Sequence, residues 1–299
     1  MRHTPVLLQE TLDALHLSVG NIVVDCTLGD AGHTEKIVEQ LGPEGKVLGI
    51  DVDPEAILRA KHFLHEYGDR VIFIRKSFSH LSEILKEQNI AGVHAILMDL
   101  GWSTPQFEER GRGFSFLKPE EPLDMRLSAD TGITAAELLA TVSEEQLAYV
   151  LRVYGEEPLA KEIAGVVIQK RQDGPIEKVA DFVECVLLAY RKKLKTDKEV
   201  PWIGGLHPAT KSFQALRIAV NNELDVLEES LPQAIDALLP GGRLAVISFH
   251  SLEDRVVKHF FKSQKNIRFI HKKPLVCGDE EYRSNPRARS AKLRVVEKI

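Results

Sequence analysis

The sequence predicts an α/β protein in which a parallel sheet is built from two separate stretches of chain. Short apolar, β-branched runs alternate with helical patterns over residues 1–107 and again over 207–299. This alternation is typical of strands joined by covering helices. From 108 to 206 the strand signals stop and the patterns become helical. We therefore expect one sheet domain in two parts, with an all-helical domain inserted between them.

The first part contains four expected strands, each followed by a helix. Their residue ranges are 22–26, 46–50, 71–74 and 93–100. The helix after the first strand is expected to stop at Gly42-Pro43, and Asp53-Pro54 is typical of a helix start. Another helix contains Leu81–Leu85. Strands spaced by helices in this way predict a parallel sheet covered on both faces.

The middle of the chain has different signals. Residues 101–130 are rich in Gly, Pro and charge and read as a long loop. Two later segments, Thr134–Glu137 and Ser143–Gln146, match the capping box that begins a helix. Apolar residues recur at helical spacing between 179 and 190. The α/β rhythm resumes near His207 and includes a further strand at 244–249.

The composition of the 299 residues excludes several classes of protein. Hydrophobic residues make up 43% and charged residues 28%, so a folded core is expected rather than general disorder. No apolar run approaches the roughly 18 residues needed to span a membrane, and the first residues do not resemble a signal peptide. Three cysteines far apart in the sequence argue against a disulfide framework. We expect a cytoplasmic protein.

Charge is distributed unevenly along the chain. The net charge is −5, yet the segment from Arg255 onwards carries thirteen Lys or Arg residues and only four Asp or Glu residues. An acidic body with a basic C-terminal segment can meet a polyanion at that segment. The alternative is that these side chains are merely solvated, and the excess of positive charge favours RNA.

An acidic turn follows the first expected strand. Asp25 and Asp30 flank a stretch containing Gly29 and Gly32, where the backbone can turn tightly. The stretch is neither GxGxxG nor a P-loop. Two carboxylates would repel a pyrophosphate but would suit a ligand with an ammonium and a sulfonium, such as S-adenosylmethionine. The alternative is a turn without a ligand.

Other candidate ligand residues follow the next strands. Asp51 ends the second strand, where a carboxylate can accept hydrogen bonds from both ribose hydroxyls. Helix capping is the alternative, but Asp53 is better placed for it. Phe78 follows the third strand and is a candidate for adenine contact or for the core, and Asp99 ends the fourth strand.

A polar cluster follows the strand at 244–249. His250 and Ser251 lie where the apolar run changes abruptly to hydrogen-bonding groups. His250 could serve as a general base, hold a substrate or play a structural role. No metal site is expected: His62 and His65 lie at helical spacing, but no third ligand completes a set.

Several long segments together resemble one known family. They include DCTLGDAGHT at 25–34, GIDVDPEAI at 49–57, DLGWSTPQ at 99–106, HPATKSFQALRIAVNNEL at 207–224 and PGGRLAVISFHSLEDRVVK at 240–258. The chain resembles the bacterial RsmH (MraW) family, the S-adenosylmethionine-dependent methyltransferases of small-subunit ribosomal RNA. The resemblance runs in order from about residue 3 to 294.

This resemblance implies a Rossmann-like methyltransferase core interrupted by a helical domain for substrate recognition. It implies methylation of the N4 amine of a cytidine in the decoding centre of 16S rRNA, with the small ribosomal subunit as partner. A homodimer is left open. The family's cofactor positions map onto Ala31, Gly32, His33, Asp51, Phe78, Asp99 and Gln106. Trp102 departs from the family pattern. It could narrow the pocket, stack on a base or pack under the inserted domain, and we favour packing.

Chemistry suggests candidates for catalysis. A cytosine amine is a poor nucleophile, so positioning and an acceptor for its protons should matter most. We hypothesise that Asp99 borders both the cofactor and the amine, with His250 and Ser251 as second candidates for holding the base. Alternatives are a methyltransferase for proteins or small molecules, a nicotinamide-dependent oxidoreductase, and a noncatalytic ribosome-assembly factor.

The loop at 107–126 is a candidate for RNA contact. Its arginines can meet phosphates and its phenylalanines can stack on splayed bases. The alternative is a loop clamped over its own core. The side chains concerned are Arg110, Arg112, Arg126, Phe107, Phe114 and Phe116.

Overall fold

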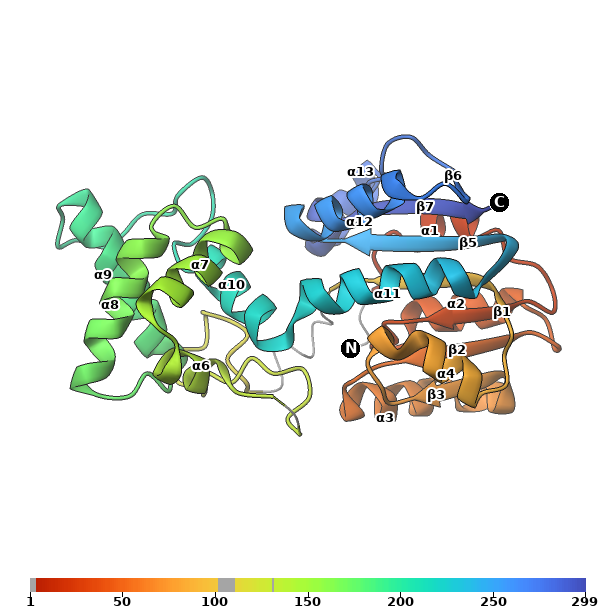
Figure 1. Cartoon of the computed structure of the whole chain (residues 1–299), viewed down its shortest axis with the longest axis horizontal. Helices are drawn as coiled ribbons and strands as arrows, with labels where there is room; N and C mark the ends of the chain where they lie inside the picture. Colours follow the sequence, from red (N-terminus) through yellow and green to blue (C-terminus); the bar gives the residue numbers. More distant parts are fainter. Residues whose placement is uncertain (1–3, 102–110, 131) are drawn as a thin grey trace. The chain divides into compact units, whose positions relative to one another are not determined.

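The computed structural model describes residues 4–101, 111–130 and 132–299, and the chain forms two compact units. The first unit combines residues 1–103 with 224–299 and contains the sheet. The described part of the second unit, residues 104–223, consists of helices joined by loops, with isolated β-bridges. Figure 1 shows the strands of the first unit in the red, orange and blue parts of the chain and the helices of the second in green and cyan.

The first unit contains a seven-stranded sheet in the order β3-β2-β1-β4-β5-β7-β6. The strands are β1 Ile22–Asp25, β2 Lys46–Ile50, β3 Val71–Ile74, β4 Val93–Asp99, β5 Leu238–Ser248, β6 Ile267–Phe269 and β7 Lys292–Lys298. Strands β1 to β5 pair in parallel, whereas β7 is antiparallel to both of its neighbours. The expected α/β fold with a parallel sheet is confirmed, and the antiparallel β7 adds to it.

Helices of the first unit cover both faces of this sheet, as the alternation predicted. The helices are α1 Leu8–Leu15, α2 Gly32–Gln40, α3 Pro54–Phe63, α4 Leu81–Glu87, α11 Glu223–Ala237, α12 Ser251–Ser263 and α13 Asp279–Ser284, with short 3-10 helices η1 His65–Arg70, η2 Phe78–His80 and η3 Pro286–Ser290. The expected start of α3 is confirmed, because the Glu55 N–H donates to the Asp53 carboxylate at 3.1 Å. The sequence patterns did not predict α1.

Successive residues of each central strand belong to opposite cores. Val23 packs with the apolar sides of α1, α2 and α3, whereas its neighbour Val24 packs with α4, α11 and α12. The same division separates Leu97 from Met98 on β4. A strand with apolar residues on both faces reads as a continuous hydrophobic run, which is why the buried strands were recognisable in the sequence.

The second unit packs its helices around a separate apolar core. These helices are α6 Ala135–Thr141, α7 Glu144–Gly155, α8 Ala160–Asp173, α9 Val179–Leu194 and α10 Thr210–Asn221. The predicted capping boxes at Thr134 and Ser143 are confirmed. Among the described residues of the whole chain, none of the helices is both long and apolar enough to cross a bilayer.

The second unit ends later than the predicted inserted segment 108–206. Helix α10 packs on α7, and the Phe213 ring of α10 lies 5.5 Å from the Phe182 ring of α9. Phe213 is therefore part of the helical core, and the compact unit runs to Glu223. The pattern at 207–221 is helical in either assignment, so periodicity alone did not say which domain the helix joins.

A partly buried ion pair joins α12 to β7. Asp254 accepts a hydrogen bond from Arg294 Nε at 2.6 Å and faces Lys292 Nζ at 3.3 Å. Burial raises the pKa of Asp254, but the hydrogen bond and charge of Arg294, together with Lys292, outweigh it, so the pKa lies below its ordinary value. The pair therefore stabilises the fold when Asp254 is ionised.

We expect Asp254→Asn to lower the free energy of unfolding at pH 7 by about 1–3 kcal/mol, the usual worth of a charged hydrogen bond. The difference from wild type should shrink as the pH falls below about 4, because the wild-type carboxylate is then protonated too. Urea unfolding at several pH values measures this, with exposed Asp13→Asn as control. An equal loss at all pH values would contradict the ion-pair explanation.

Candidate functional site

The strand order reverses between β1 and β4, and ligands of open α/β sheets bind at such a point beyond the carboxyl ends of the strands. Asp25 ends β1 and Asp99 ends β4. The loops that follow are joined, since the Asp99 N–H donates to Thr27 Oγ1 at 2.7 Å and the Cys26 N–H donates to the Leu97 carbonyl at 2.9 Å. The predicted candidates therefore gather at one edge of the sheet.

Asp25 is a structural residue of the turn after β1. Its side chain is buried, and its carboxylate accepts hydrogen bonds from Thr34 Oγ1 at 2.6 Å and from the Thr27 N–H at 3.1 Å. Burial raises its pKa, while these hydrogen bonds and nearby His33 oppose the rise. Partners from its own loop hold the Asp25 carboxylate, so its expected suitability for a cationic ligand stays a prediction.

The Asp30 carboxylate is also held by a partner within the protein. It is buried, and its Oδ1 accepts from Arg59 Nε at 2.8 Å, which ties the turn to α3. The acidic character of the turn therefore serves the loop itself. The cofactor was inferred from this charge, but its support must come from other residues of the same edge.

The turn brings Ala31, Gly32 and His33 to the start of α2. Ala31 is fully buried and adopts a left-handed conformation with φ 59°. A Cβ on Gly32 would lie 2.5 Å from Pro5 Cγ, so only glycine lets the N-terminal segment pack this closely. His33 is buried, with Nε2 3.1 Å from the Val6 carbonyl oxygen and Nδ1 3.5 Å from Asp99 Oδ2. Their expected contact with a cofactor stays a prediction.

Asp51 stands directly after β2 and connects two loops. Its Oδ2 accepts from the Gly29 N–H and its Oδ1 from the Asp53 N–H, both at 2.9 Å. Asp53, and not Asp51, caps α3. Each carboxylate oxygen has a second lone pair, so Asp51 can hold the turn and still accept from ribose hydroxyls. The ribose role stays a prediction.

Phe78 begins η2 after β3 and is half-buried against the apolar cluster that contains Leu81. Its ring is thus partly core and partly accessible, and the adenine contact stays a prediction. Gln106, the remaining expected cofactor residue, and Trp102 lie outside the described residues.

Asp99 is the most exposed of the acidic groups at the ends of β1 and β4. Its side chain is 24% exposed, yet Oδ1 is itself buried and has no hydrogen-bond partner. Burial raises the pKa of Asp99; His33 and Arg287 oppose the rise, and the carboxylates of Asp25 and Glu253 reinforce it. A buried acceptor without a donor is costly, so this oxygen is suited to a donor that arrives with a ligand.

Arg287 is a residue of this edge that the sequence interpretation missed. It lies on η3, with its guanidinium carbon 5.8 Å from the centre of the Phe249 ring. Burial lowers its pKa, and the charges of Asp99 and Asp30 oppose that effect. The sequence signalled only a basic C-terminal segment, because no local pattern marks which of its cations returns to the sheet edge.

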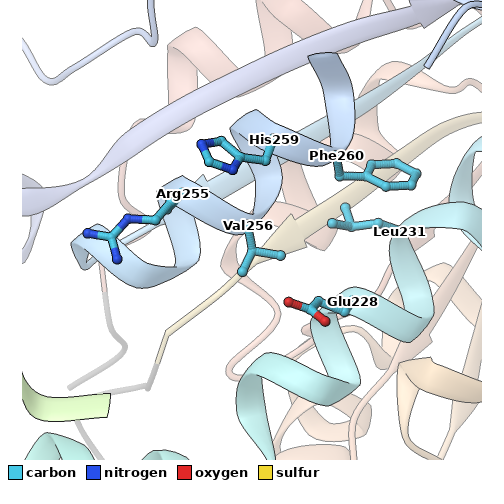
Figure 2. Close-up of a pocket in the computed structure, with 6 residues that line it drawn as sticks. All are labelled: Glu228, Leu231, Arg255, Val256, His259 and Phe260. Atoms are coloured by element: carbon cyan, nitrogen blue, oxygen red, sulfur yellow. The ribbon is translucent and has the colours of Figure 1, made fainter. Parts of the chain in front are cut away.

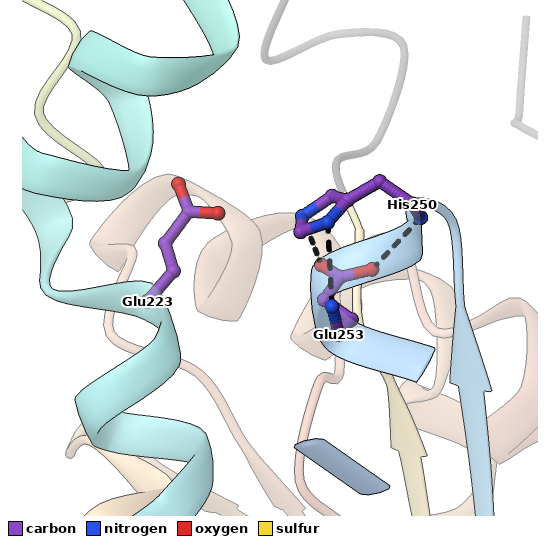
Figure 3. A group of neighbouring side chains, drawn as sticks. All are labelled: Glu223, His250 and Glu253. Carbon is purple, nitrogen blue, oxygen red and sulfur yellow. Dashed lines mark hydrogen bonds and ion pairs between the residues drawn. The ribbon is translucent and has the colours of Figure 1, made fainter. Parts of the chain in front are cut away.

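His250 and Glu253 form a capping box at the start of α12 (Figure 3). His250 Nδ1 accepts from the Glu253 N–H at 3.4 Å, and Glu253 Oε2 accepts from the Phe249 N–H at 2.7 Å and from the His250 N–H at 3.3 Å. His250 Nε2 lies 3.1 Å from Glu253 Oε1, although no hydrogen bond aligns between them. His250 therefore has a structural role, because it caps α12 and pairs with Glu253. Ser251 is the first residue of this helix and is exposed. Their catalytic roles stay predictions, as does the expected absence of a metal.

The described part of the loop 107–126 packs within the second unit, to which it belongs. Phe114 is 6% exposed, Arg112 Nη1 donates to the carbonyl of Arg126 at 2.9 Å, and Arg126 forms two hydrogen bonds with Asp124. For these residues the clamped alternative describes the structure. Phe116 stacks on His207, with ring centres 4.4 Å apart. Phe107 and Arg110 lie outside the described residues.

A pocket lies between α11 and α12 (Figure 2). Its lining is Glu228, Leu231, Arg255, Val256, His259 and Phe260. None of the predicted cofactor residues line it. Because both the acidic Glu228 and the basic Arg255 line the pocket, its charge does not favour either an anionic or a cationic ligand. The edge beyond β1 and β4 remains the better candidate site.

Comparison with known proteins identifies the family. The family model described as "MraW methylase family" matches residues 1–299. The chain belongs to the MraW methylase family. This methylase is 42% identical to "Ribosomal RNA small subunit methyltransferase H" of Heliobacterium modesticaldum, over 99% of this chain and 98% of that protein. It is 45% identical to the protein of the same name from Dictyoglomus thermophilum, over 99% and 96%.

A solved structure is also similar to this methylase at a lower level. An rRNA methylase from Streptococcus thermophilus aligns with a TM-score of 0.44 and 12% identity, over 98% of this chain and 93% of that one. Such a distant similarity carries no weight beside the family match. The resemblance seen in the sequence segments is confirmed by the family model and by the curated relatives.

Proposed function

We propose that this methylase transfers a methyl group from S-adenosylmethionine to the exocyclic N4 amine of a cytidine in the decoding centre of 16S rRNA. Its family and the rRNA methyltransferase names of its relatives support the reaction class and the RNA substrate. The observation that carries the proposal is the buried, unpartnered Asp99 Oδ1 beyond the end of β4. An acceptor without a donor, at the point where the sheet order reverses, fits an amine substrate.

The residues of this edge fit the cofactor. When bound, S-adenosylmethionine supplies an electrophilic methyl carbon on a positively charged sulfur. Asp51 would accept from its ribose, Phe78 would contact its adenine, and the Ala31–His33 turn would border it. Gln106 completes the proposed set. The negative charge of an ionised Asp99 carboxylate would attract a cationic cofactor and repel a pyrophosphate.

Methyl transfer at N4 requires orientation and a proton acceptor. The bound cofactor would supply the methyl group to the N4 nitrogen, and its sulfur would keep the electron pair of the broken carbon–sulfur bond. One proton would then leave N4 for Asp99 Oδ1. Holding the amine in line with the carbon–sulfur bond should supply most of the acceleration, and Asp99 stabilises the charge that develops on nitrogen. His250 and Ser251 are the second candidates for holding the base.

We also propose how the rest of the chain meets its substrate. The helical unit serves substrate recognition, and the basic C-terminal segment contacts rRNA in the small subunit. The target base must leave its stack to reach the cleft, at a cost of a few kcal/mol that is least in single-stranded RNA. A protein that modifies ribosomal RNA in this way would work in the cytoplasm, which is the location that we propose.

The test is methyl transfer from tritiated S-adenosylmethionine to small subunits that lack the modification, followed by mapping of the labelled nucleotide. We expect label on N4 of one decoding-centre cytidine. Cofactor binding without label on subunits would favour a protein or small-molecule substrate. Absence of both would favour a noncatalytic assembly factor.

A further inference from the structure

His33, at the start of α2, lies between two oxygens that can accept a proton from its ring nitrogens. His33 Nε2 lies 3.1 Å from the Val6 carbonyl, and His33 Nδ1 lies 3.5 Å from Asp99 Oδ2. The ring is buried, which prevents solvent from replacing these partners freely. All three groups belong to the same compact unit.

The tautomer follows from the carbonyl. A carbonyl oxygen can only accept a hydrogen bond, so Nε2 must carry a proton. In a neutral ring Nδ1 would then direct a lone pair at a carboxylate oxygen, and two lone pairs facing one another repel. The contact becomes attractive when one further proton lies between Nδ1 and Oδ2. That proton belongs to the pair, because these two sites are coupled.

Charged groups from four elements set the balance at Asp99. His33 from α2 and Arg287 from η3 favour the ionised carboxylate, whereas Asp25 from β1 and Glu253 from α12 oppose it. His33 itself also faces Asp25. Of these two side chains, His33 is the one within ion-pair distance of the Asp99 carboxylate among the described residues.

We propose that His33 is a positioning residue for the methyl transfer: it carries a proton on Nδ1 that faces Asp99 Oδ2 across the 3.5 Å ion-pair contact, and so leaves Oδ1 as the charged acceptor for the target amine. This proton has two consequences. It keeps Asp99 ionised in surroundings that would otherwise neutralise it, and it fixes which oxygen turns to the substrate. The proposal rests on the proposed function for its catalytic meaning, but the proton itself exists without substrate.

The first experiment detects the proton directly in the substrate-free protein. Nitrogen-15 NMR of the histidine rings distinguishes protonated from unprotonated ring nitrogens. We expect His33 Nδ1 to show a protonated signal in the wild type and an unprotonated signal in Asp99→Asn at the same pH. An unprotonated Nδ1 in the wild-type chain, unchanged in Asp99→Asn, would overturn the proposal. This comparison needs no enzymatic activity, so it stays informative even if the substrate is different.

The second experiment measures the pH dependence of kcat in His33→Asn. Asparagine can donate a hydrogen bond to one of the two oxygens but carries no titrating proton. We expect the acid limb of the profile to move to higher pH by about one unit or more, because Asp99 loses the nearby positive charge that holds it ionised. Exposed His62→Asn on α3 is the matched control and should keep the wild-type profile. An unmoved acid limb in His33→Asn would overturn the positioning role. If the wild type labels no subunit at all, the proposed function fails, and the NMR comparison still decides whether His33 Nδ1 carries the proton that faces Asp99.

Discussion

Asp99→Asn should lower kcat for methyl transfer by about 10²–10⁴-fold, the range expected when a positioned proton acceptor is lost. The amide keeps the size of the carboxylate but cannot accept the N4 proton or stabilise positive charge on nitrogen. Affinity for the cofactor should change by about tenfold or less, since a neutral hydrogen bond replaces a charged one. The effect should therefore appear in the chemical step.

Single-turnover methyl transfer, with cofactor binding measured by calorimetry, separates these quantities. Asp69→Asn, on the exposed surface of η1, is the matched control. Because the pKa of Asp99 lies above its ordinary value of 3.8, wild-type kcat should fall as the pH drops through that raised pKa, and Asp99→Asn should lack this limb. A variant with full kcat would remove Asp99 from the mechanism.

Asp51→Ala should weaken cofactor binding by about 10²-fold. Two hydrogen bonds from ribose hydroxyls to a carboxylate are lost, each worth about 1.5–3 kcal/mol, and part of this is recovered by water. The backbone N–H groups of Gly29 and Asp53 also lose their acceptor, so the turn before α2 should loosen. Calorimetric titration with S-adenosylmethionine measures the affinity.

The two contributions of Asp51 can be separated. Asp51→Asn keeps an oxygen for one backbone N–H, so it should recover thermal stability more fully than it recovers affinity. Asp69→Ala serves as control for the loss of an acidic side chain. If Asp51→Ala bound the cofactor as tightly as wild type, the ribose role would be refuted, and Asp51 would be a loop residue only.

The buried strands were predictable because each is an unbroken apolar run between turn signals. The ranges 46–50 and 71–74 match β2 and β3 residue for residue, and Asp53-Pro54 marks the start of α3. Helix α1 was not predicted, because it has only eight residues and its mixed polar and apolar sequence is too short for a clear helical periodicity. The end of the helical unit was also missed, because whether α10 joins one core or another depends on contacts with α7 that are distant in sequence.

The candidate site was predictable only in part. Acidic residues at strand ends were visible, and the topology brings Asp25 and Asp99 to one edge as expected. Their different states were not visible: Asp25 is occupied by Thr34, nine residues away, whereas Asp99 keeps an oxygen without a partner. Nor could local patterns bring Arg287 to this edge, since that placement depends on β7 joining β5.

The position of β7 in the sheet has a consequence for how a newly made chain acquires activity. Strand β7 lies between β5 and β6, and η3 immediately precedes it. During synthesis the helical unit, which is continuous in sequence, can fold while the remaining residues are still being added. The sheet cannot be completed at that stage. Strand β4 can pair with β5 only after the whole inserted unit has been made, and Arg287 can reach the candidate site only after β7 has been made. Translation therefore completes the helical unit first and the edge of the sheet with the candidate site last, so an unfinished chain lacks part of that candidate site.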